Sequence, residues 1–495
     1  MITPTIAAMD TTLIEQLVYM ASAFFFVTGL KKLTKVKTAR AGNRMASIAM
    51  LVAVLMTVYL VAFKGQFHGD SVEAIKASIP WMVGGLVVGG LIGIFLAKKV
   101  EMTEMPELVA FFNGMGGASS LFVALATVVA FGSGAVSIGS EQTLSAFKGG
   151  DISLSIGLSI LIGSVTLTGS LVAYAKLSGK MWKNRFGPVG TPGLNILLAV
   201  AAIGLVVFGG FLATGAMSTT AFLILTAVAL FLGVGLVVPI GGADMPVVIS
   251  LLNSYSGIAA AMTGFILQNN LLIVAGMLVG AAGLILTQIM CKAMNRSLSN
   301  VLFAKFGEDD GEKGDTEYKG VTSTSAEELA PLLEAASKVI IVPGYGLAVA
   351  QAQHKCRELG DLLEATGIDV SYGIHPVAGR MPGHMNVLLA EADVAYEKLF
   401  DLDQINGEFK NAEIVIVIGA NDVCNPEAYD NPASPIAGMP VLDVWDAQTV
   451  IVIKRSLSAG YAGIKNPLFE RDNCLMFFGD AKQALEDMVT EFKDL

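Results

Sequence analysis

Long apolar runs separated by short polar segments dominate the first 300 residues of the chain. A helix needs about 20 apolar residues to cross the hydrocarbon core of a bilayer. Nine runs meet this length, so residues 1–300 are predicted to form a multi-span α-helical membrane domain. The predicted spans are Leu13–Leu30, Met45–Phe63, Pro80–Ala97, Glu107–Phe131, Ile152–Ala175, Leu194–Ala213, Thr219–Ile240, Pro246–Leu267 and Leu271–Met290.

The pattern changes after residue 300. Phe306–Thr324 is polar, acidic and rich in glycine, so residues 301–330 are predicted to be an acidic flexible linker, and Thr324–Glu327 reads as a capping box at the start of a short helix. From residue 331 to 495, short β-branched runs alternate with helix-like stretches, which predicts a Rossmann-like doubly wound α/β domain. The predicted strands are Val339–Val342, Ile368–Tyr372, Lys398–Leu402, Glu413–Ile418, Val441–Val444, Val450–Ile453 and Leu475–Phe478.

Charge divides the chain at the same place. Before residue 301 there are 17 Lys and Arg against 10 Asp and Glu, and from residue 301 onward there are 15 against 32. The basic residues of the front half cluster after alternate spans, and the positive-inside rule therefore places the N-terminus outside and the acidic back half in the cytoplasm. The four cysteines have neither metal-ligand spacing nor a disulfide framework, which fits a reducing compartment.

A glycine turn follows the first strand of the back half. Gly344, Gly346 and Val349 occupy the marked positions of a G-x-G-x-x-G/A-like turn, and Ala348–Glu358 is rich in helix formers. Such a strand, turn and helix can hold a pyrophosphate on backbone N–H groups, with Gly346 allowing close approach and Val349 packing helix on strand. The alternative is an ordinary strand-to-helix turn.

A basic cluster bears on the choice of nucleotide. An NAD site usually has an acid at the end of the second strand, and the residues from Val370 to His375 contain none. Lys454, Arg455 and Ser456 directly follow a later strand, and two cations with a hydroxyl suit a ribose 2′-phosphate. A solvated pair of charges at a strand end is the alternative, but the missing acid favours NADP.

Three further loops are punctuated by glycine and proline at expected carboxyl edges of strands, where a ligand binds. They are His375–His384, Gly419–Pro426 and Gly460–Gly463. Turn chemistry for the glycines, an Asx turn for Asp422 and simple packing for Cys424 are the alternatives.

The membrane half contains an internal repeat. Glu104-Met105-Pro106 precedes Asn113, and Asp244-Met245-Pro246 precedes Asn253 at the same spacing, which suggests a parallel duplication. Asn113 and Asn253 are then expected at equivalent depths, lining a polar path. Bridging between helices is the alternative. Serines expected to accompany them are Ser119, Ser120, Ser170, Ser254 and Ser256.

Over essentially its whole length, the chain resembles the beta subunit of proton-translocating NAD(P) transhydrogenase. The resemblance rests on Pro-Gly-Tyr-Gly-Leu-Ala-Val-Ala-Gln-Ala-Gln (343–353), Gly-Ile-His-Pro-Val-Ala-Gly-Arg (373–380), Gly-Ala-Asn-Asp (419–422), Lys-Arg-Ser (454–456), Gly-Tyr-Ala-Gly (460–463), and Gly-Gly-Ala-Asp-Met-Pro with Asn-Ser-Tyr-Ser-Gly in the membrane half.

The resemblance implies that the back half binds NADP(H) in a pose flipped relative to the usual Rossmann one. Catalytic roles near the ligand are implied for Arg380 and Asp422, and Tyr461 would lie on a lid. The implied cofactor-binding residues are Gly344, Tyr345, Gly346, Leu347, Ala348, Val349, Gly379, Arg380, Gly419, Ala420, Asn421, Asp422, Lys454, Arg455, Ser456, Gly460, Tyr461, Ala462 and Gly463.

The resemblance also implies a partner alpha subunit that carries NAD(H) and further membrane helices, with hydride passing between the two nicotinamides. The membrane half would carry the proton, and we place Asn113, Ser170, Asp244 and Asn253 on its path. Some family members have a histidine where this chain has Asn113. A proton relay needs a group that titrates, so a partner's histidine is expected to serve here.

Other functions compete with this one. The main alternative is an ion transporter with a cytoplasmic nucleotide-sensing domain, but the chain has no Thr-Val-Gly-Tyr-Gly filter. A non-catalytic membrane scaffold leaves the glycine turn and the basic cluster unused. We expect a multi-pass protein of the bacterial cytoplasmic (inner) membrane that acts in the lipid bilayer as a dimer of protomers, with no nucleic acid partner.

Overall fold

The computed structural model describes residues 3–33, 36–60, 72–100, 104–132, 150–179, 190–209, 216–241, 244–303, 318–381, 383–460 and 462–495. The chain divides into two compact units. One comprises Met1–Glu101, Glu107–Val238 and Leu251–Ile285, and the other comprises Met102–Pro106, Pro239–Ser250 and Leu286–Leu495.

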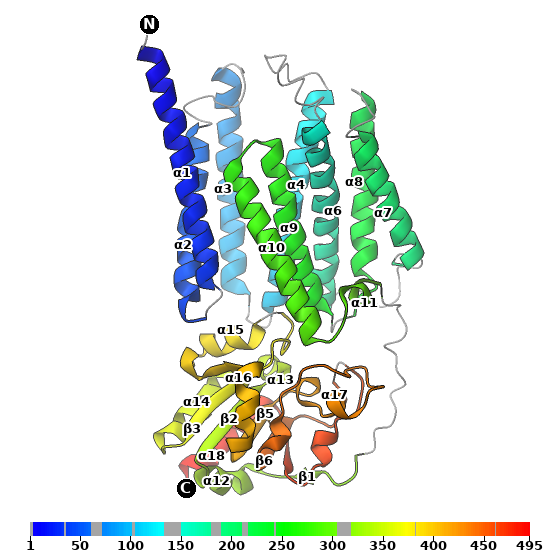
Figure 1. The fold of residues 1–495 in the computed structure, drawn as a ribbon. Coiled ribbons are helices and arrows are strands. Elements are labelled where there is room, and N and C mark those ends of the chain that lie inside the picture. The colour runs from blue at the N-terminus through cyan, green and yellow to red at the C-terminus, as the bar shows by residue number, and fades with distance from the viewer. Residues whose placement is uncertain are drawn as a thin grey trace. The chain divides into compact units, whose positions relative to one another are not determined.

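Each of the nine predicted spans coincides with a helix over its described residues, while residues 61–63 and 210–213 of two spans lie outside the described part. In the front half, α1 and α2 lie side by side, as do α6 and α8 (Figure 1). Seven of the described helices are long and apolar enough to cross a membrane, while α7 is shorter and α1 is not among the seven. The helices are α1(Thr3–Leu33), α2(Val36–Tyr59), α3(Val72–Lys99), α4(Met105–Gly132), α6(Gly150–Leu177), α7(Pro192–Val207), α8(Ala216–Val237), α9(Met245–Ile266) and α10(Asn270–Ala293), followed by the short α11(Leu298–Phe303).

Small residues let these helices approach closely. A Cβ on Gly257 would lie 2.5 Å from the backbone nitrogen of Gly280, so α9 and α10 meet backbone to backbone. Gly117 of α4 is equally close to α6, where its Cβ would lie 2.8 Å from the carbonyl oxygen of Gly163. The frequent glycines of the front half therefore serve helix packing.

The back half folds around a seven-stranded sheet of order β1-β7-β6-β5-β2-β3-β4, in which every pairing is parallel. The order reverses between β2 and β5, so loops diverge there at the carboxyl edge and leave room for a ligand. The strands are β1(Thr322–Ser323), β2(Lys338–Pro343), β3(Asp369–Ile374), β4(Leu399–Asp401), β5(Ile414–Ile418), β6(Thr449–Lys454) and β7(Cys474–Phe478).

Both faces of the sheet are covered, which explains why the strands are apolar without alternation. Along β2, Val339 and Ile341 pack into one core, while Ile340 and Val342 pack into the other. The α-helices are α12(Ala326–Glu334), α13(Tyr345–Val349), α14(Gln353–Ala365), α15(His384–Glu391), α16(Leu402–Ile405), α17(Glu427–Asp430) and α18(Ala481–Lys493). Short 3-10 turns occur at η4(Tyr396–Lys398), η5(Asn406–Asn411), η6(Asp422–Cys424), η7(Val444–Asp446) and η8(Pro467–Glu470).

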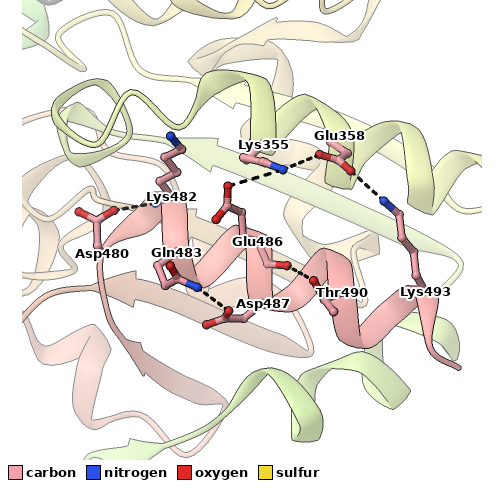
Figure 2. A network of polar contacts seen from close by, with 9 residues as sticks. All are labelled: Lys355, Glu358, Asp480, Lys482, Gln483, Glu486, Asp487, Thr490 and Lys493. Atoms are coloured by element: carbon pink, nitrogen blue, oxygen red, sulfur yellow. Dashed lines mark hydrogen bonds and ion pairs between the residues drawn. The ribbon is translucent and has the colours of Figure 1, made fainter.

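A surface ion network joins α14 to α18 (Figure 2). Lys355 lies 3.1 Å from Glu358 and 3.6 Å from Glu486, and Lys493 lies 2.8 Å from Glu358. All four side chains are about one-third or more exposed, so solvent screens each pair and the network adds little to stability. Each helix is held to the domain by its own buried apolar side, which includes Leu359 of α14 and Leu485 of α18.

Two predictions of local structure were wrong. Val441–Val444 is not a strand, because its backbone bonds to loops: Leu442 N donates to the carbonyl oxygen of Val423 and Asp443 N donates to Asn406. Its buried apolar residues pack without joining the sheet. The helix predicted over Ala348–Glu358 is broken at Gln351, whose φ of 49° ends α13 before α14 begins.

The start of the back half also differs from the prediction. The expected linker over 301–330 contains regular structure, because β1 pairs with β7 and α12 packs on α18. Residues 304–317 of it lie outside the described residues. The cap of α12 is shifted by one position. Ser325 rather than Thr324 is the N-cap, and its hydroxyl accepts a hydrogen bond from Glu328 N. Thr324 and Ser325 each have a glutamate three residues later, Glu327 and Glu328, and the folded backbone uses the second pair.

This shift in the cap can be tested. Ser325→Ala removes the acceptor for Glu328 N, and loss of an N-cap costs about 1 kcal/mol. Amide exchange across α12 should then accelerate roughly fivefold, as read by hydrogen–deuterium exchange of the full chain. Thr324→Ala, the matched control, should change the exchange of the Glu328 amide little. Equal acceleration in the two variants would contradict Ser325 as the cap.

Candidate functional site

Two glycine turns cross at the carboxyl edge of the sheet. A Cβ on Gly344 would lie 2.5 Å from Ala420 N, and one on Gly346 would lie 2.6 Å from the Cα of Gly419. Gly344 N and Gly346 N donate to the carbonyl oxygens of Ile418 and Gly419 at 2.8 and 2.9 Å. Side chains are excluded on both turns because the turn after β2 and the turn after β5 touch backbone to backbone.

This crossing changes the interpretation of the glycine motif. The N–H of Gly346 is bonded within the protein, and its missing side chain makes room for Gly419, whose φ is +62°. Val349 was predicted to pack helix on strand and is instead 46% exposed. Leu347 and Ala348 make that packing, because both are fully buried in the core.

The basic cluster lies where β6 ends. Lys454 Nζ donates to the carbonyl oxygen of Ser458 at 2.6 Å and lies 5.0 Å from the ring centroid of Phe469. Burial lowers the pKa of Lys454, so a nearby anion would compensate for its lost hydration. Arg455 is exposed, and no ion pair or hydrogen bond to it occurs within the described residues. The Ser456 hydroxyl lies 2.9 Å from that of Ser458.

Asp422 holds the loop that follows the basic cluster. Its Oδ2 accepts a hydrogen bond from Ala462 N at 3.0 Å, and a Cβ on Gly460 would collide with both carboxylate oxygens. With its amide oxygen facing the donors, neighbouring Asn421 accepts from Lys454 Nζ at 3.1 Å and from Gly460 N at 2.7 Å. Tyr461, the expected lid residue, lies outside the described residues.

Arg380 reaches the site from the loop after β3. Its guanidinium carbon lies 4.7 Å from the ring centroid of Tyr345, a cation–π contact with the turn after β2. Its backbone N–H donates to Nδ1 of buried His384 at 3.1 Å, and Gly379, with φ of +113°, leaves room for that ring. The loop therefore depends on histidine packing and on a positive-φ glycine.

His375 closes the base of the same loop. Its Nδ1 accepts from Val377 N at 3.2 Å, so Nε2 carries the proton and donates to the carbonyl oxygen of Pro440 at 2.7 Å. Burial lowers the pKa of His375 to about 4, and the side chain is therefore neutral at neutral pH. This imidazole ties the loop after β3 to the segment before Val441.

These loops surround a cavity of about 840 Å³. The sequence-predicted residues that line it are Gly344, Tyr345, Gly346, Val349, Gly379, Arg380, Gly419, Ala420, Asn421, Asp422, Lys454, Arg455, Ser456, Gly460, Ala462 and Gly463. Leu347 and Ala348 are not among its lining residues. Val377, within the predicted loop His375–His384, also lines it, whereas lining by Ser458, Ile436 and Asp480 was not predicted. Asp480 follows the last strand and caps α18, a strand-end position that could have identified it.

In the membrane half, Asn113 and Asn253 occupy matching helix positions. Each lies eight residues after the first residue of its helix, Met105 for α4 and Met245 for α9, or about 12 Å along the axis. Asn113 is buried and Asn253 is partly buried. The spacing of the repeat is therefore reproduced in the described helices.

The acids of the repeat differ from each other. Asp244 is 3% exposed, and its Oδ2 accepts from Arg296 at 2.7 Å, whereas Glu104 is exposed. Ser170 is fully buried on α6 beside Gly114, and its Oγ has no hydrogen-bond partner within the described residues. Of the other expected companions, Ser120 and Ser254 are buried, Ser256 is partly buried and Ser119 is exposed.

A second group of polar contacts joins α4, α6 and α9 farther along these helices. The hydroxyl of Ser159 on α6 lies 3.1 Å from that of Thr263 on α9 and 3.2 Å from the carbonyl oxygen of Ser120 on α4. Ser254, by contrast, donates to the carbonyl oxygen of Gly280 and so contributes to helix packing. Ser159 and Thr263 were missed because single hydroxyls in apolar runs carry no sequence signal.

Comparison with known proteins gives a consistent answer over nearly the whole chain. Residues 15–491 match the family described as NAD(P) transhydrogenase beta subunit. Two relatives, both named NAD(P) transhydrogenase subunit beta and both from Rhodospirillum rubrum, are 47% identical over 474 residues, which cover 95% of this chain and 97% of each relative. Apolar helices, a parallel nucleotide-type sheet and this similarity agree, and the chain belongs to the NAD(P) transhydrogenase beta subunit family.

Proposed function

We propose that this chain binds NADP(H) in the cavity at the carboxyl edge of its sheet, while an alpha subunit carries NAD(H). As a transhydrogenase beta subunit, the chain acts in hydride transfer that is coupled to proton movement. The observation that supports NADP(H) on this chain most directly is the basic cluster, where half-buried Lys454 and exposed Arg455 lie beside two hydroxyls. A 2′-phosphate would supply the anion that this cluster lacks.

The surroundings fit a dinucleotide phosphate. The end of β3 carries buried, neutral His375 rather than an acid, so nothing there favours the unphosphorylated ribose hydroxyl. Arg380, whose guanidinium lies over the Tyr345 ring, is a third cation in the site and would pair with the diphosphate. Asp422 and Asn421 bond to Ala462 N and Gly460 N, which places these two residues at the cavity where a nucleotide would bind. When bound, NADP(H) supplies the nicotinamide carbon that exchanges hydride.

The membrane half is proposed to carry the proton past Asn113, Asn253 and Ser170, with Asp244 at the cytoplasmic end. Neither asparagine titrates, so each orients water or a histidine of the partner. A fully buried Ser170 hydroxyl without a partner in the described residues would cost free energy in lipid, and water on the path would satisfy it.

The remaining parts of the proposal concern arrangement. Residues 1–300 are assigned to the proton-translocating domain and 331–495 to the NADP(H) domain. Of the connection predicted over 301–330, β1 and the start of α12 pack with the NADP(H) domain. The positive charges after alternate spans favour an outside N-terminus and a cytoplasmic C-terminal domain in the bacterial inner membrane. The complete enzyme pairs this chain with an alpha subunit, and we propose that two such protomers form a dimer.

The assignment of NADP(H) can be tested at the basic cluster. Replacing Lys454 and Arg455 by Ala should weaken NADP(H) binding by about 3–6 kcal/mol, at about 1.5–3 kcal/mol per charged hydrogen bond. Titration calorimetry on the assembled complex measures this loss. Weak NAD(H) binding to this chain should change little, and Lys355→Ala with Lys493→Ala, which removes two surface cations, is the control. An equal loss for both nucleotides would refute the assignment.

The neutral state of His375 predicts a pH dependence. Its pKa falls from 6.5 in the unfolded chain to about 4 in the folded domain. Between these values the unfolded chain binds a proton that the folded one does not, so stability falls as pH drops from about 6.5 to about 4. The full difference is about 3 kcal/mol at about 1.36 kcal/mol per pKa unit.

Hydrogen exchange of the 375–385 loop at pH 7 and pH 5 measures the effect of His375 protonation. His375→Gln should flatten this pH dependence, because glutamine does not titrate. Replacement of the exposed His354 by Gln is the matched control and should leave the dependence intact. A loop whose exchange follows only the intrinsic pH effect would contradict the prediction.

The proton path can be tested at Asn253. Asn253→Leu removes the polar group, so proton uptake into vesicles and steady-state NADP reduction should both fall at least tenfold if the two are coupled. The cyclic reaction through bound NADP(H) should survive, because the nucleotide cavity lies outside the membrane. Asn113→Leu should act similarly, or more mildly if a partner's histidine is the main carrier, and exposed Ser119→Ala is the control. Normal proton pumping by the Asn253→Leu variant would mean that the repeat serves only helix packing and that the proton takes another path.

A further inference from the structure

We propose that Tyr318 is a positioning residue for the NADP(H) site and that it acts through Asn466 and Phe469. The inference rests on the proposed binding of NADP(H) in the cavity and names a residue that does not line it. Tyr318 is the residue at which the described chain resumes after 304–317. Its contacts lead, in one or two steps, to Asn421 and Lys454.

The first step joins Tyr318 to the loop before η8. The Tyr318 hydroxyl accepts a hydrogen bond from Asn466 N at 3.1 Å. The tyrosine ring packs 5.9 Å from the ring of Phe469, centroid to centroid, and Lys465 Nζ lies 5.1 Å from the tyrosine centroid. The Tyr318 side chain therefore contacts Lys465 and Asn466 of the loop and Phe469 of η8 by three different interactions.

The second step runs from Asn466 to the turn after β5. Asn466 is fully buried, and its Oδ1 accepts from Leu468 N at 3.0 Å, which fixes the orientation of the amide. Its Nδ2 donates to the main-chain carbonyl oxygen of Asn421 at 3.1 Å. Asn421 lines the cavity beside Asp422. A displacement of Asn466 would therefore shift the backbone that carries both residues.

A parallel step runs through Phe469. This ring is fully buried, and Lys454 Nζ lies 5.0 Å from its centroid. Phe469 therefore contacts both Tyr318 and the lysine proposed to bind the 2′-phosphate. Because Lys454 is partly desolvated, its position depends on this ring and on the carbonyl of Ser458.

The hydroxyl of Tyr318 is not needed to hold its own segment in place. Lys319 N donates to Glu470 Oε1 at 2.6 Å, Lys465 forms an ion pair with the same carboxylate at 2.7 Å, and β1 pairs with β7 a few residues later. Removing the hydroxyl alone should therefore leave the segment docked while it frees Asn466 N. The hydroxyl oxygen of Tyr318 can therefore be removed to test its effect on the site without unfolding the segment.

The test uses the complete chain assembled with its alpha subunit in vesicles. Tyr318→Phe removes one neutral hydrogen bond and keeps the ring, so the dissociation constant for NADP(H) should rise about fivefold and NADP(H) release should quicken. Tyr318→Ala also removes the ring from Phe469 and should raise the constant further. NAD(H) binding on the alpha subunit should not change. Tyr396→Phe, a partly buried tyrosine on η4 away from the cavity, is the matched control.

An unchanged NADP(H) dissociation constant and release rate in Tyr318→Phe would overturn the inference. So would a loss of affinity that Tyr396→Phe reproduces, or one that follows a drop in thermal stability of the same size. The Lys454→Ala, Arg455→Ala variant distinguishes the two proposals. If it weakens NADP(H) binding and Tyr318→Phe does not, only the role of Tyr318 fails. If it also has no effect, the cavity assignment fails and the inference with it.

Discussion

The crossing of two turns, backbone against backbone, determines where the cavity lies. Gly344 and Gly346 touch Gly419 and Ala420 so closely that a Cβ at any of the three glycines would overlap a main-chain atom. This contact joins the ends of β2 and β5 at the point where the strand order reverses. The other loops, from β3 and β6, reach over this base, and so Arg380 and Lys454 can line one cavity although they lie far apart in sequence.

The sequence predicted those features that come from composition and spacing. Nine apolar runs became helices because lipid requires every backbone group to be bonded within the segment. Six of the seven predicted strands formed, while Val441–Val444 bonds to loops that no periodicity reveals. The sequence identified the motif glycines but not why glycine is required there, because the close approach of Gly419 to Gly346 is a tertiary contact. Val349 was misread for the same reason, since the helix it was expected to anchor breaks at Gln351.

The two copies of the repeat in the membrane half match in position but not in the environment of their acidic residues. Asn113 and Asn253 hold equivalent positions in α4 and α9, but Asp244 is buried against Arg296 while Glu104 is exposed. The buried carboxylate is desolvated and paired with a guanidinium, whereas the exposed one is hydrated. Two copies of one motif have therefore diverged in electrostatics without diverging in spacing, and spacing is what a sequence displays.

The contact of Tyr318 with Asn466 has a thermodynamic consequence that holds in both directions. If docking of Tyr318 favours the arrangement of Asn421 and Lys454 that binds nucleotide, then bound nucleotide must favour docking of Tyr318 by the same free energy. The chain just before Tyr318 leads back to the helices of the membrane half. By the same linkage, anything that displaces Tyr318 would lower nucleotide affinity. Nucleotide binding and the docking of a residue that does not touch the nucleotide would then be two measures of one equilibrium.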